Sequence, residues 1–202
     1  MTDQSPVLAF PAELAPVYRF LGRLWLREAD EEAMKTWRIV SDTIAADNGI
    51  EDESLNDLSI EYCRLFVGPR DHFPPFQSVW QQGQLNGTAC ISMERFLSHT
   101  GYTSQHDLGD IPPDHFGLQL DVFGWMLEQQ MSSSDPCIFE VVDEFRRAHV
   151  LWSGVLLKRV EQAAETDLYQ QLARTTQALL QLNETQHSST ERVGWASPTL
   201  LK

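Results

Sequence analysis

The sequence has few basic residues for its number of acidic ones. Lys and Arg together number 15 and Asp and Glu number 29, so the formal net charge of the 202 residues is −14. Such a surface repels phosphate groups, which disfavours nucleic acids and anionic membranes as partners. It would attract a basic partner, such as a peptide that contains Arg or Lys, although an excess of one charge can also serve solubility alone.

Cysteine is also scarce. The chain has three cysteines, Cys63, Cys90 and Cys137. An odd number at wide spacing predicts neither a disulfide framework nor a CxxC zinc or redox motif. Because Cys63 follows Tyr62 in an apolar helical pattern, we expect it to be a buried, reduced thiol in a reducing compartment.

Long apolar runs and a secretion signal are missing too. No stretch approaches about 18 uninterrupted apolar residues, so we expect no insertion into a membrane. The first six residues, Met-Thr-Asp-Gln-Ser-Pro, contain no basic segment of the kind that opens a signal peptide. A cytoplasmic location is therefore expected.

The common cofactor motifs are absent. The sequence contains no GxGxxG, no phosphate loop and no G-x-S-x-G, and none of its six histidines forms HxxxH or HExxH. Dinucleotide, Walker-type nucleotide and α/β-hydrolase sites thus lack their main markers. We expect no metal and no cofactor.

Helical periodicity runs through most of the chain. Apolar residues recur at three- and four-residue spacing, and no alternating strand pattern of useful length is present. The pattern predicts an all-α, single-domain bundle of roughly eight to ten helices. The expected helices cover 11–28, 30–48, a segment ending at 68–69, 89–100, 116 to a break at 132–136, 138–165 and 167–182.

The domain is expected to span residues 1–182, with a polar, mobile tail over 183–202. The helix from residue 116 is apolar on most sides, which predicts a central place in the bundle. Residues 101–111 could form a hinge that permits helix exchange between protomers, so both a monomer and a homodimer remain open.

The segment 61–80 combines a helix with an aromatic loop. Gly68-Pro69 should end the helix, and Pro74-Pro75 should stiffen the loop that follows. Three rings, Phe73, Phe76 and Trp80, surround this loop. They suit either the sealing of a core or an apolar surface that receives a peptide.

Asp114 and His115 stand at the start of the central helix. Asp114 could face the exposed N–H groups of that helix start, or it could orient His115 as a general base. Neighbouring residues point about 100° apart on a helix, which disfavours the second arrangement. His149 lies on an apolar helical face and is expected to be a satisfied core histidine.

Two blocks of sequence together resemble the TorD/DmsD family of redox-enzyme maturation chaperones. The first is Tyr-x-Arg-Leu-Phe-x-Gly-Pro at 62–69, followed by Pro-Pro-x-x-Ser-Val-Trp at 74–80. The second is Pro-Asp-His-Phe-Gly at 113–117, and His-x-x-Trp at 149–152 is a weaker third match. Their order, their separation and the helical layout also fit.

The resemblance implies a cytoplasmic chaperone, not an enzyme, for molybdenum-cofactor oxidoreductases of the dimethyl sulfoxide or trimethylamine N-oxide reductase type. Such a protein binds the twin-arginine signal peptide, the apo form of its client, or both. It assists cofactor insertion and delays export. The peptide-binding positions that the resemblance implies are Tyr62, Pro75, Phe76, Ser78, Trp80, Asp114 and His115. Asp114 would pair with a peptide arginine.

Some residues depart from the family pattern. Phe76-Gln77 stands where relatives often have Trp-Gly or an acidic residue, and Leu151 replaces the proline before the late Trp. These changes put the client in doubt. Two other functions stay open: an all-α hydrolase with His115 as general base, and an assembly scaffold for the apoenzyme that ignores the signal peptide. If the loop and the helix start form one peptide site, the 74–80 loop and Asp114 should lie on one face.

Overall fold

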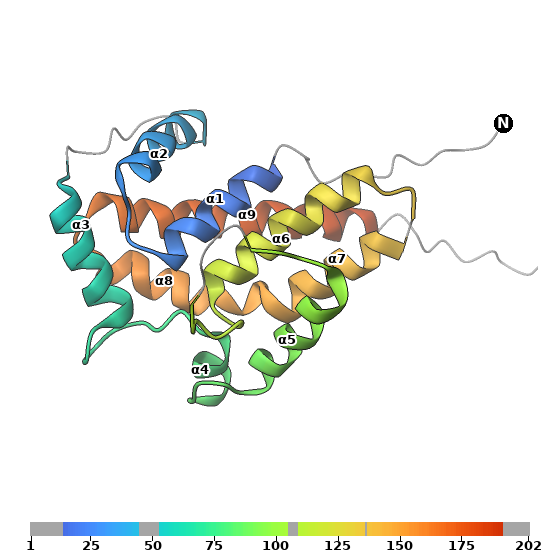
Figure 1. Ribbon diagram of the computed structural model, residues 1–202. Coiled ribbons are helices and arrows are strands. Elements are labelled where there is room, and N and C mark those ends of the chain that lie inside the picture. The colour runs from blue at the N-terminus through green and yellow to red at the C-terminus, as the bar shows by residue number, and fades with distance from the viewer. Residues whose placement is uncertain (1–13, 45–52, 105–108, 136, 192–202) are drawn as a thin grey trace, which may run out of the picture.

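The computed structural model describes residues 14–44, 53–104, 109–135 and 137–191. Over these ranges the chain is helical and has no strand, which confirms the all-α prediction (Figure 1). The α-helices are α1 (Leu14–Leu26), α2 (Glu31–Ile44), α3 (Leu55–Tyr62), α4 (Gln77–Gln82), α5 (Thr88–Thr100), α6 (Phe116–Ser132), α7 (Cys137–His149), α8 (Gly154–Ala163) and α9 (Asp167–Glu191). A π-helix, η1 (Cys63–Val67), continues α3, and a 3₁₀ turn, η2 (Leu151–Ser153), joins α7 to α8. No helix of the described ranges is long and apolar enough to cross a bilayer.

Helices α1 and α6 pack against each other along their lengths (Figure 1). Glycines make the close approach possible: a Cβ on Gly22 of α1 would lie 2.6 Å from the carbonyl oxygen of Gly117 on α6. A Cβ on Gly124 would meet the carbonyl oxygen of Ala15 at 2.7 Å. The two backbones therefore touch where a side chain would hold them apart.

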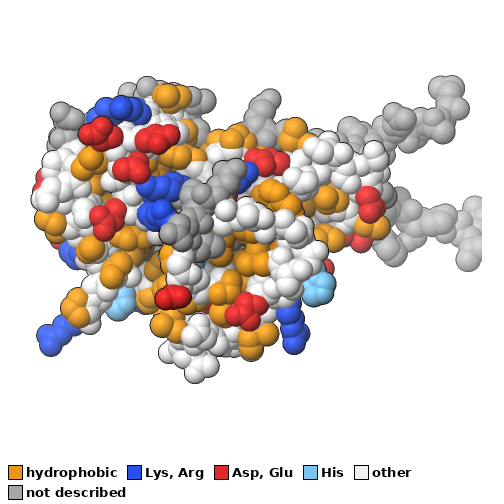
Figure 2. All heavy atoms as spheres, in the orientation of Figure 1, with side chains coloured by type: hydrophobic (Ala, Val, Ile, Leu, Met, Phe, Trp, Pro, Cys, Tyr) orange, Lys and Arg blue, Asp and Glu red, His pale blue; other side chains and the backbone are white. Residues whose placement is uncertain are grey.

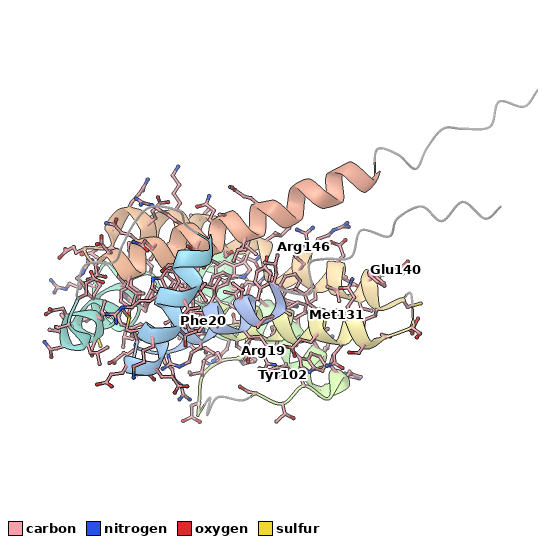
Figure 3. The ribbon with its side chains drawn as sticks, turned by 90° about the horizontal axis from the view of Figure 1, so that it is seen from above. Arg19, Phe20, Tyr102, Met131, Glu140 and Arg146 are labelled. Atoms are coloured by element: carbon pink, nitrogen blue, oxygen red, sulfur yellow. The ribbon has the colours of Figure 1, made fainter. Side chains whose placement is uncertain are left out.

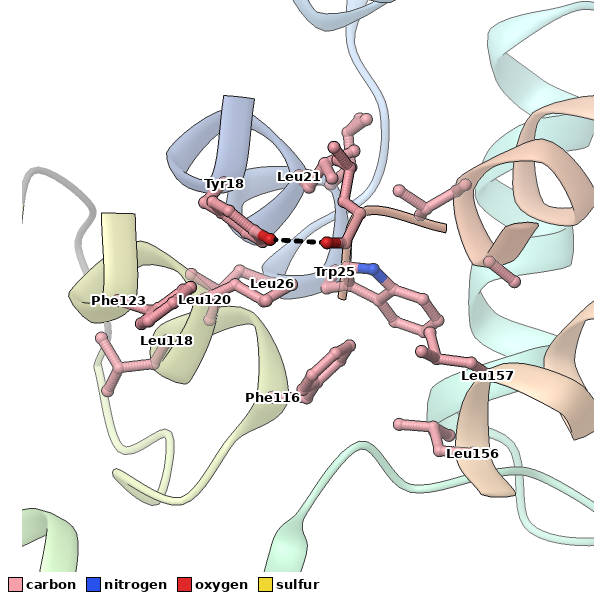
Figure 4. Close-up of a cluster of buried hydrophobic side chains, with 14 of the residues drawn as sticks. Tyr18, Leu21, Trp25, Leu26, Phe116, Leu118, Leu120, Phe123, Leu156 and Leu157 are labelled. Atoms are coloured by element: carbon pink, nitrogen blue, oxygen red, sulfur yellow. Dashed lines mark hydrogen bonds between the residues drawn. The ribbon is translucent and has the colours of Figure 1, made fainter. Parts of the chain in front are cut away.

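Helix α6 lies at the centre of the core, as its pattern predicted. Most of its apolar residues are buried, although Met131 near its end is exposed, and Phe116 packs edge-on against Trp25 of α1 (Figure 4). Two hydrogen bonds connect α1 to α9: the Tyr18 hydroxyl donates to the Leu179 carbonyl at 3.1 Å, and the Trp25 indole donates to the Thr176 hydroxyl at 3.2 Å. Helices α1 and α9, the first and last of the described residues, thus share one core.

A polar cluster holds the segment before α6 against the bundle. Arg19 of α1 donates to Asp121 of α6 at 2.9 Å and to Glu128 at 3.1 Å. The hydroxyl of Tyr102 donates to the other oxygen of Asp121, and Figure 3 shows Arg19 and Tyr102 side by side. On the face shown in Figure 2, acidic groups lie among apolar side chains, and basic groups gather over α1 and α2.

Several helix boundaries differ from the predictions. Residues 77–82 form α4 where a loop was expected. The predicted helix 138–165 is broken, because η2 turns the chain at Val150 and Gly154 starts a new helix. Helix α9 continues past Leu182 to Glu191, since no Gly or Pro stops it before then.

Cys63 is exposed, so its predicted burial was wrong. Its neighbour Tyr62 takes the inward position, and successive residues of a helix point about 100° apart. The predicted helix start at Pro11, helix end at Asn48-Gly49, residues 105–108 of the proposed hinge and residues 192–202 of the tail lie outside the described residues.

We expect Gly22→Ala to destabilise the fold by roughly 1–3 kcal/mol, because its methyl group would force α1 away from α6. Gly154→Ala is the matched control: nothing lies within 4 Å of its Cβ position, and its φ of −54° suits any residue. That control should raise stability by about 0.5–1 kcal/mol. Urea unfolding checks both values, and equal effects of the two changes would contradict the close-contact explanation.

Candidate functional site

The two sequence blocks lie side by side. Phe76 and His115 form an isolated antiparallel bridge. The Phe116 N–H donates to the Pro75 carbonyl at 2.7 Å, and the Gln77 N–H donates to the Asp114 carbonyl at 3.1 Å. The expected juxtaposition of the 74–80 segment with Asp114 is therefore present.

Asp114 caps the start of α4 and not the start of α6, the helix that follows it in the sequence. Its side chain is fully buried, and Oδ2 accepts a hydrogen bond of 2.8 Å from the Ser78 N–H. Ser78 is the second residue of α4, so Asp114 satisfies one of the N–H groups that a helix start leaves unpaired. The prediction that Asp114 faces the start of the central helix was wrong in its choice of helix.

His115 is the residue that caps α6. Its Nδ1 accepts a hydrogen bond of 3.1 Å from the Gly117 N–H. Burial lowers the pKa of His115 to about 3, so the ring is neutral near pH 7. With Nδ1 an acceptor, the neutral ring carries its proton on Nε2 and can offer only a donor to a ligand.

An apolar groove of about 650 Å³ lies between η1, α4 and the start of α6. Four of the predicted site residues line it: Tyr62, Pro75, Phe76 and His115. The remaining lining residues are Leu26, Phe66, Val67, His72, Pro74, Val79, Gly83, Gln84, Leu85 and Ile111. None of the lining residues is Asp, Glu, Lys or Arg.

Part of this groove is open to solvent. Val67 is 65% exposed and Leu85 is 53% exposed, although both are apolar. Phe76 packs its ring edge-to-face against His115, with 5.0 Å between ring centroids. A groove lined by exposed aliphatic side chains and aromatic rings is typical of a site that binds an apolar ligand.

Trp80 lies in a second groove, of about 510 Å³, next to the first. His72, Pro74 and Val79 line both. The Trp80 indole donates to the Pro74 carbonyl at 2.7 Å, and the Arg159 guanidinium carbon lies 5.5 Å from the centroid of its ring. Trp80 therefore belongs to the neighbouring groove and not to the one that holds Phe76.

A buried polar network supports α4 from the other side. The Gln77 amide donates to the Ala148 carbonyl at 2.7 Å, and its oxygen lies 2.7 Å from Gln119 Nε2 and 3.1 Å from His149 Nδ1. His149 Nε2 is 3.0 Å from the Ser92 hydroxyl, which confirms His149 as a satisfied core histidine. Burial lowers its pKa. Gln77 and Gln119 were not predicted to be site residues, because a glutamine within a helical pattern gives no sign of its burial.

Ser78 and His115 do not form a nucleophile and base. The Ser78 hydroxyl is buried and has no hydrogen-bond partner among the described residues. His115 Nδ1 is already occupied by a backbone N–H. A general base must reach the proton that it removes, and this geometry does not provide that contact. The arrangement is suited to binding.

Comparison with known proteins shows the family to which the chain belongs. The profile of the nitrate reductase delta subunit family matches residues 26–158, from the end of α1 into α8. These residues include the whole lining of the first groove and all of the second except Arg159. The chain belongs to this family. The resemblance to the TorD/DmsD chaperones of redox-enzyme maturation is thereby confirmed.

Two relatives extend the comparison. The chaperone protein YcdY of Escherichia coli K12 is 24% identical over 176 residues, which cover 81% of this chain and 90% of YcdY. A crystal structure from Archaeoglobus fulgidus, described as a redox enzyme maturation protein, superposes with a TM-score of 0.57 at 20% identity. It covers 89% of this chain and 99% of that one. The solved structure shows that the fold is shared, and the family indicates a chaperone of redox-enzyme maturation.

We expect Asp114→Ala to destabilise the protein by about 1–2 kcal/mol, because α4 loses the acceptor at its start. Asp114→Asn should lose less free energy of unfolding, because the Asn amide oxygen can still accept a hydrogen bond from the Ser78 N–H. Urea unfolding of both variants measures the difference. If the Asn and Ala variants lose the same free energy of unfolding, the carboxylate stabilises the protein through its charge and not through the hydrogen bond.

We expect His115 to make the protein less stable in acid. Its pKa is about 3 when folded and 6.5 in the unfolded reference, so the unfolded chain takes up the proton first. The stability from a neutral His115 is complete above pH 6.5 and is lost progressively as the pH falls toward about 3, at up to about 1.4 kcal/mol per pH unit.

His115→Asn tests this pH dependence, because an Asn oxygen can also cap α6 but does not titrate. Between pH 6.5 and pH 4.5, the free energy of unfolding of the variant should fall less steeply than that of the unmodified chain. Gly154→Ala, which changes no titratable group, is the control and should leave the slope unchanged. An unchanged slope for His115→Asn would refute the assignment.

Proposed function

We propose that this protein is a cytoplasmic chaperone that binds the signal peptide of a redox enzyme before export. The main support for this proposal is the apolar groove. Both family motifs contribute to its lining, and none of its lining residues is Asp, Glu, Lys or Arg. Twin-arginine signal peptides carry an apolar segment beside their arginines, and this segment fits such a groove in chemistry. The client would be a molybdenum-cofactor oxidoreductase of the dimethyl sulfoxide or trimethylamine N-oxide reductase type.

The predicted site residues would act in two ways. Tyr62, Pro75, Phe76 and His115 line the groove and would contact the peptide. The Tyr62 hydroxyl donates to the Trp25 carbonyl at 3.3 Å, so this ring is held in place before a ligand arrives.

Ser78 and Asp114 are fully buried and would act through α4, whose position they fix. The bound peptide would keep the client from export while the cofactor is inserted. This role needs no chemistry from the chaperone itself, which agrees with the occupied Nδ1 of His115.

Peptide titration by calorimetry or fluorescence anisotropy tests the proposal. The double variant Val67→Ser, Leu85→Ser removes exposed apolar surface at the groove, so we expect it to bind a twin-arginine signal peptide about tenfold more weakly. Ile39→Ser is the matched control, because Ile39 is 70% exposed on α2 and lines neither groove. It should bind as tightly as the unmodified chain.

A client with its signal peptide removed separates the scaffold function from peptide binding. If the truncated client binds as tightly as the complete one, and the isolated peptide does not bind, the protein is an assembly scaffold and the signal-peptide proposal is wrong.

A further inference from the structure

The apolar groove leaves the arginines of a bound peptide without a partner. The carboxylate of Asp114, the acid expected to meet an arginine, is fully buried under α4 and bonded to the Ser78 N–H. None of the residues that line the apolar groove carries a carboxylate. An arginine next to the apolar segment must therefore be bound elsewhere.

The neighbouring groove offers the chemistry that a guanidinium requires. Asp71 lines it with an exposed side chain, and so does the partly exposed ring of Trp80. Asp71 has a φ of +55°, which is uncommon for a residue other than glycine. A carboxylate and an indole face in one groove can provide both an ion pair and a cation–π contact.

The chain already places one guanidinium in this groove. Arg159 of α8 lies with its guanidinium carbon 5.5 Å from the centroid of the Trp80 ring. The Trp80 indole N–H is fixed by its hydrogen bond to the Pro74 carbonyl, so the ring keeps its orientation. Arg159 is exposed and has a flexible side chain, so it can move aside from this position.

We propose that the second groove is the arginine subsite: a peptide guanidinium takes the place of Arg159 on the Trp80 ring, beside Asp71. This inference rests on the proposed function and adds the source of its specificity. His72, Pro74 and Val79 belong to both grooves, so one continuous peptide can place its apolar segment in the first and its arginine in the second. A planar guanidinium stacks on an indole better than the compact ammonium of lysine does, so arginine is preferred.

The experiment compares two peptides on four forms of the protein, and a third, twin-lysine peptide on the unmodified chain alone. One peptide has the twin-arginine sequence, and in the other both arginines are replaced by glutamine while the apolar segment is kept. The proteins are the unmodified chain, Asp71→Asn, Arg159→Gln and the charge-matched control Glu140→Gln. Glu140, on α7, lines neither groove.

Asp71→Asn should weaken binding of the arginine peptide about threefold and leave the glutamine peptide unchanged. Arg159→Gln should tighten binding of the arginine peptide about threefold, because the competing guanidinium is gone. Glu140→Gln should change neither affinity, which excludes a general effect of net charge. On the unmodified chain, a twin-lysine peptide should bind more weakly than the arginine peptide.

Two failures are distinguishable. If both peptides bind the unmodified chain but Asp71→Asn and Arg159→Gln affect them equally or not at all, the arginine subsite is wrong and the apolar groove stands. If neither peptide binds the unmodified chain, both the proposed function and the arginine subsite are wrong.

Discussion

The candidate site depends on one short antiparallel contact, between residues 75–77 and 114–116. Two backbone hydrogen bonds and the buried carboxylate of Asp114 join these segments. Helix α4 has only six residues, far fewer than the roughly 12–15 that an isolated helix needs to be stable in water. Its existence therefore comes from this contact and from the Gln77 network behind it. The orientation of Phe76, of Trp80 and of both grooves follows from how α4 is held.

The contact is itself placed by the packing of α1 on α6. Gly22 and Gly117 let the two backbones meet directly at the first turn of α6, and His115 and Asp114 immediately precede that turn. Phe116 then packs on Trp25, so the start of α6 is fixed in the core on one side and presents His115 to the groove on the other. In this way the close packing of α1 on α6 fixes the position of the residues that line the open groove.

Most of the fold could be predicted from periodicity and helix-end signals, because long amphipathic helices show their buried face in sequence. Helix α4 could not, since its capping acid is Asp114, which lies 36 residues further along the chain. The break after His149 was missed although Gly154 stood near it. The motifs predicted that the 74–80 segment and Asp114 lie together, but they did not reveal that Asp114 and Ser78 are buried or that Trp80 lines a separate groove. The burial of Asp114 and Ser78 and the position of Trp80 depend on which side of α4 each neighbouring segment occupies. A local sequence pattern does not contain this information.

The hydrogen bond from Tyr18 to Leu179 also has a consequence for the order of assembly during synthesis. Helix α1 leaves the ribosome first, yet the core around it is closed only when α9 arrives. Until α6 is packed on α1, the 75–77 segment has no partner, so a nascent or partly folded chain has no groove. A ligand of the groove can therefore bind only after α1 and α6 have packed together. The intact groove then depends on helices that lie far apart in the sequence, from α1 to α9.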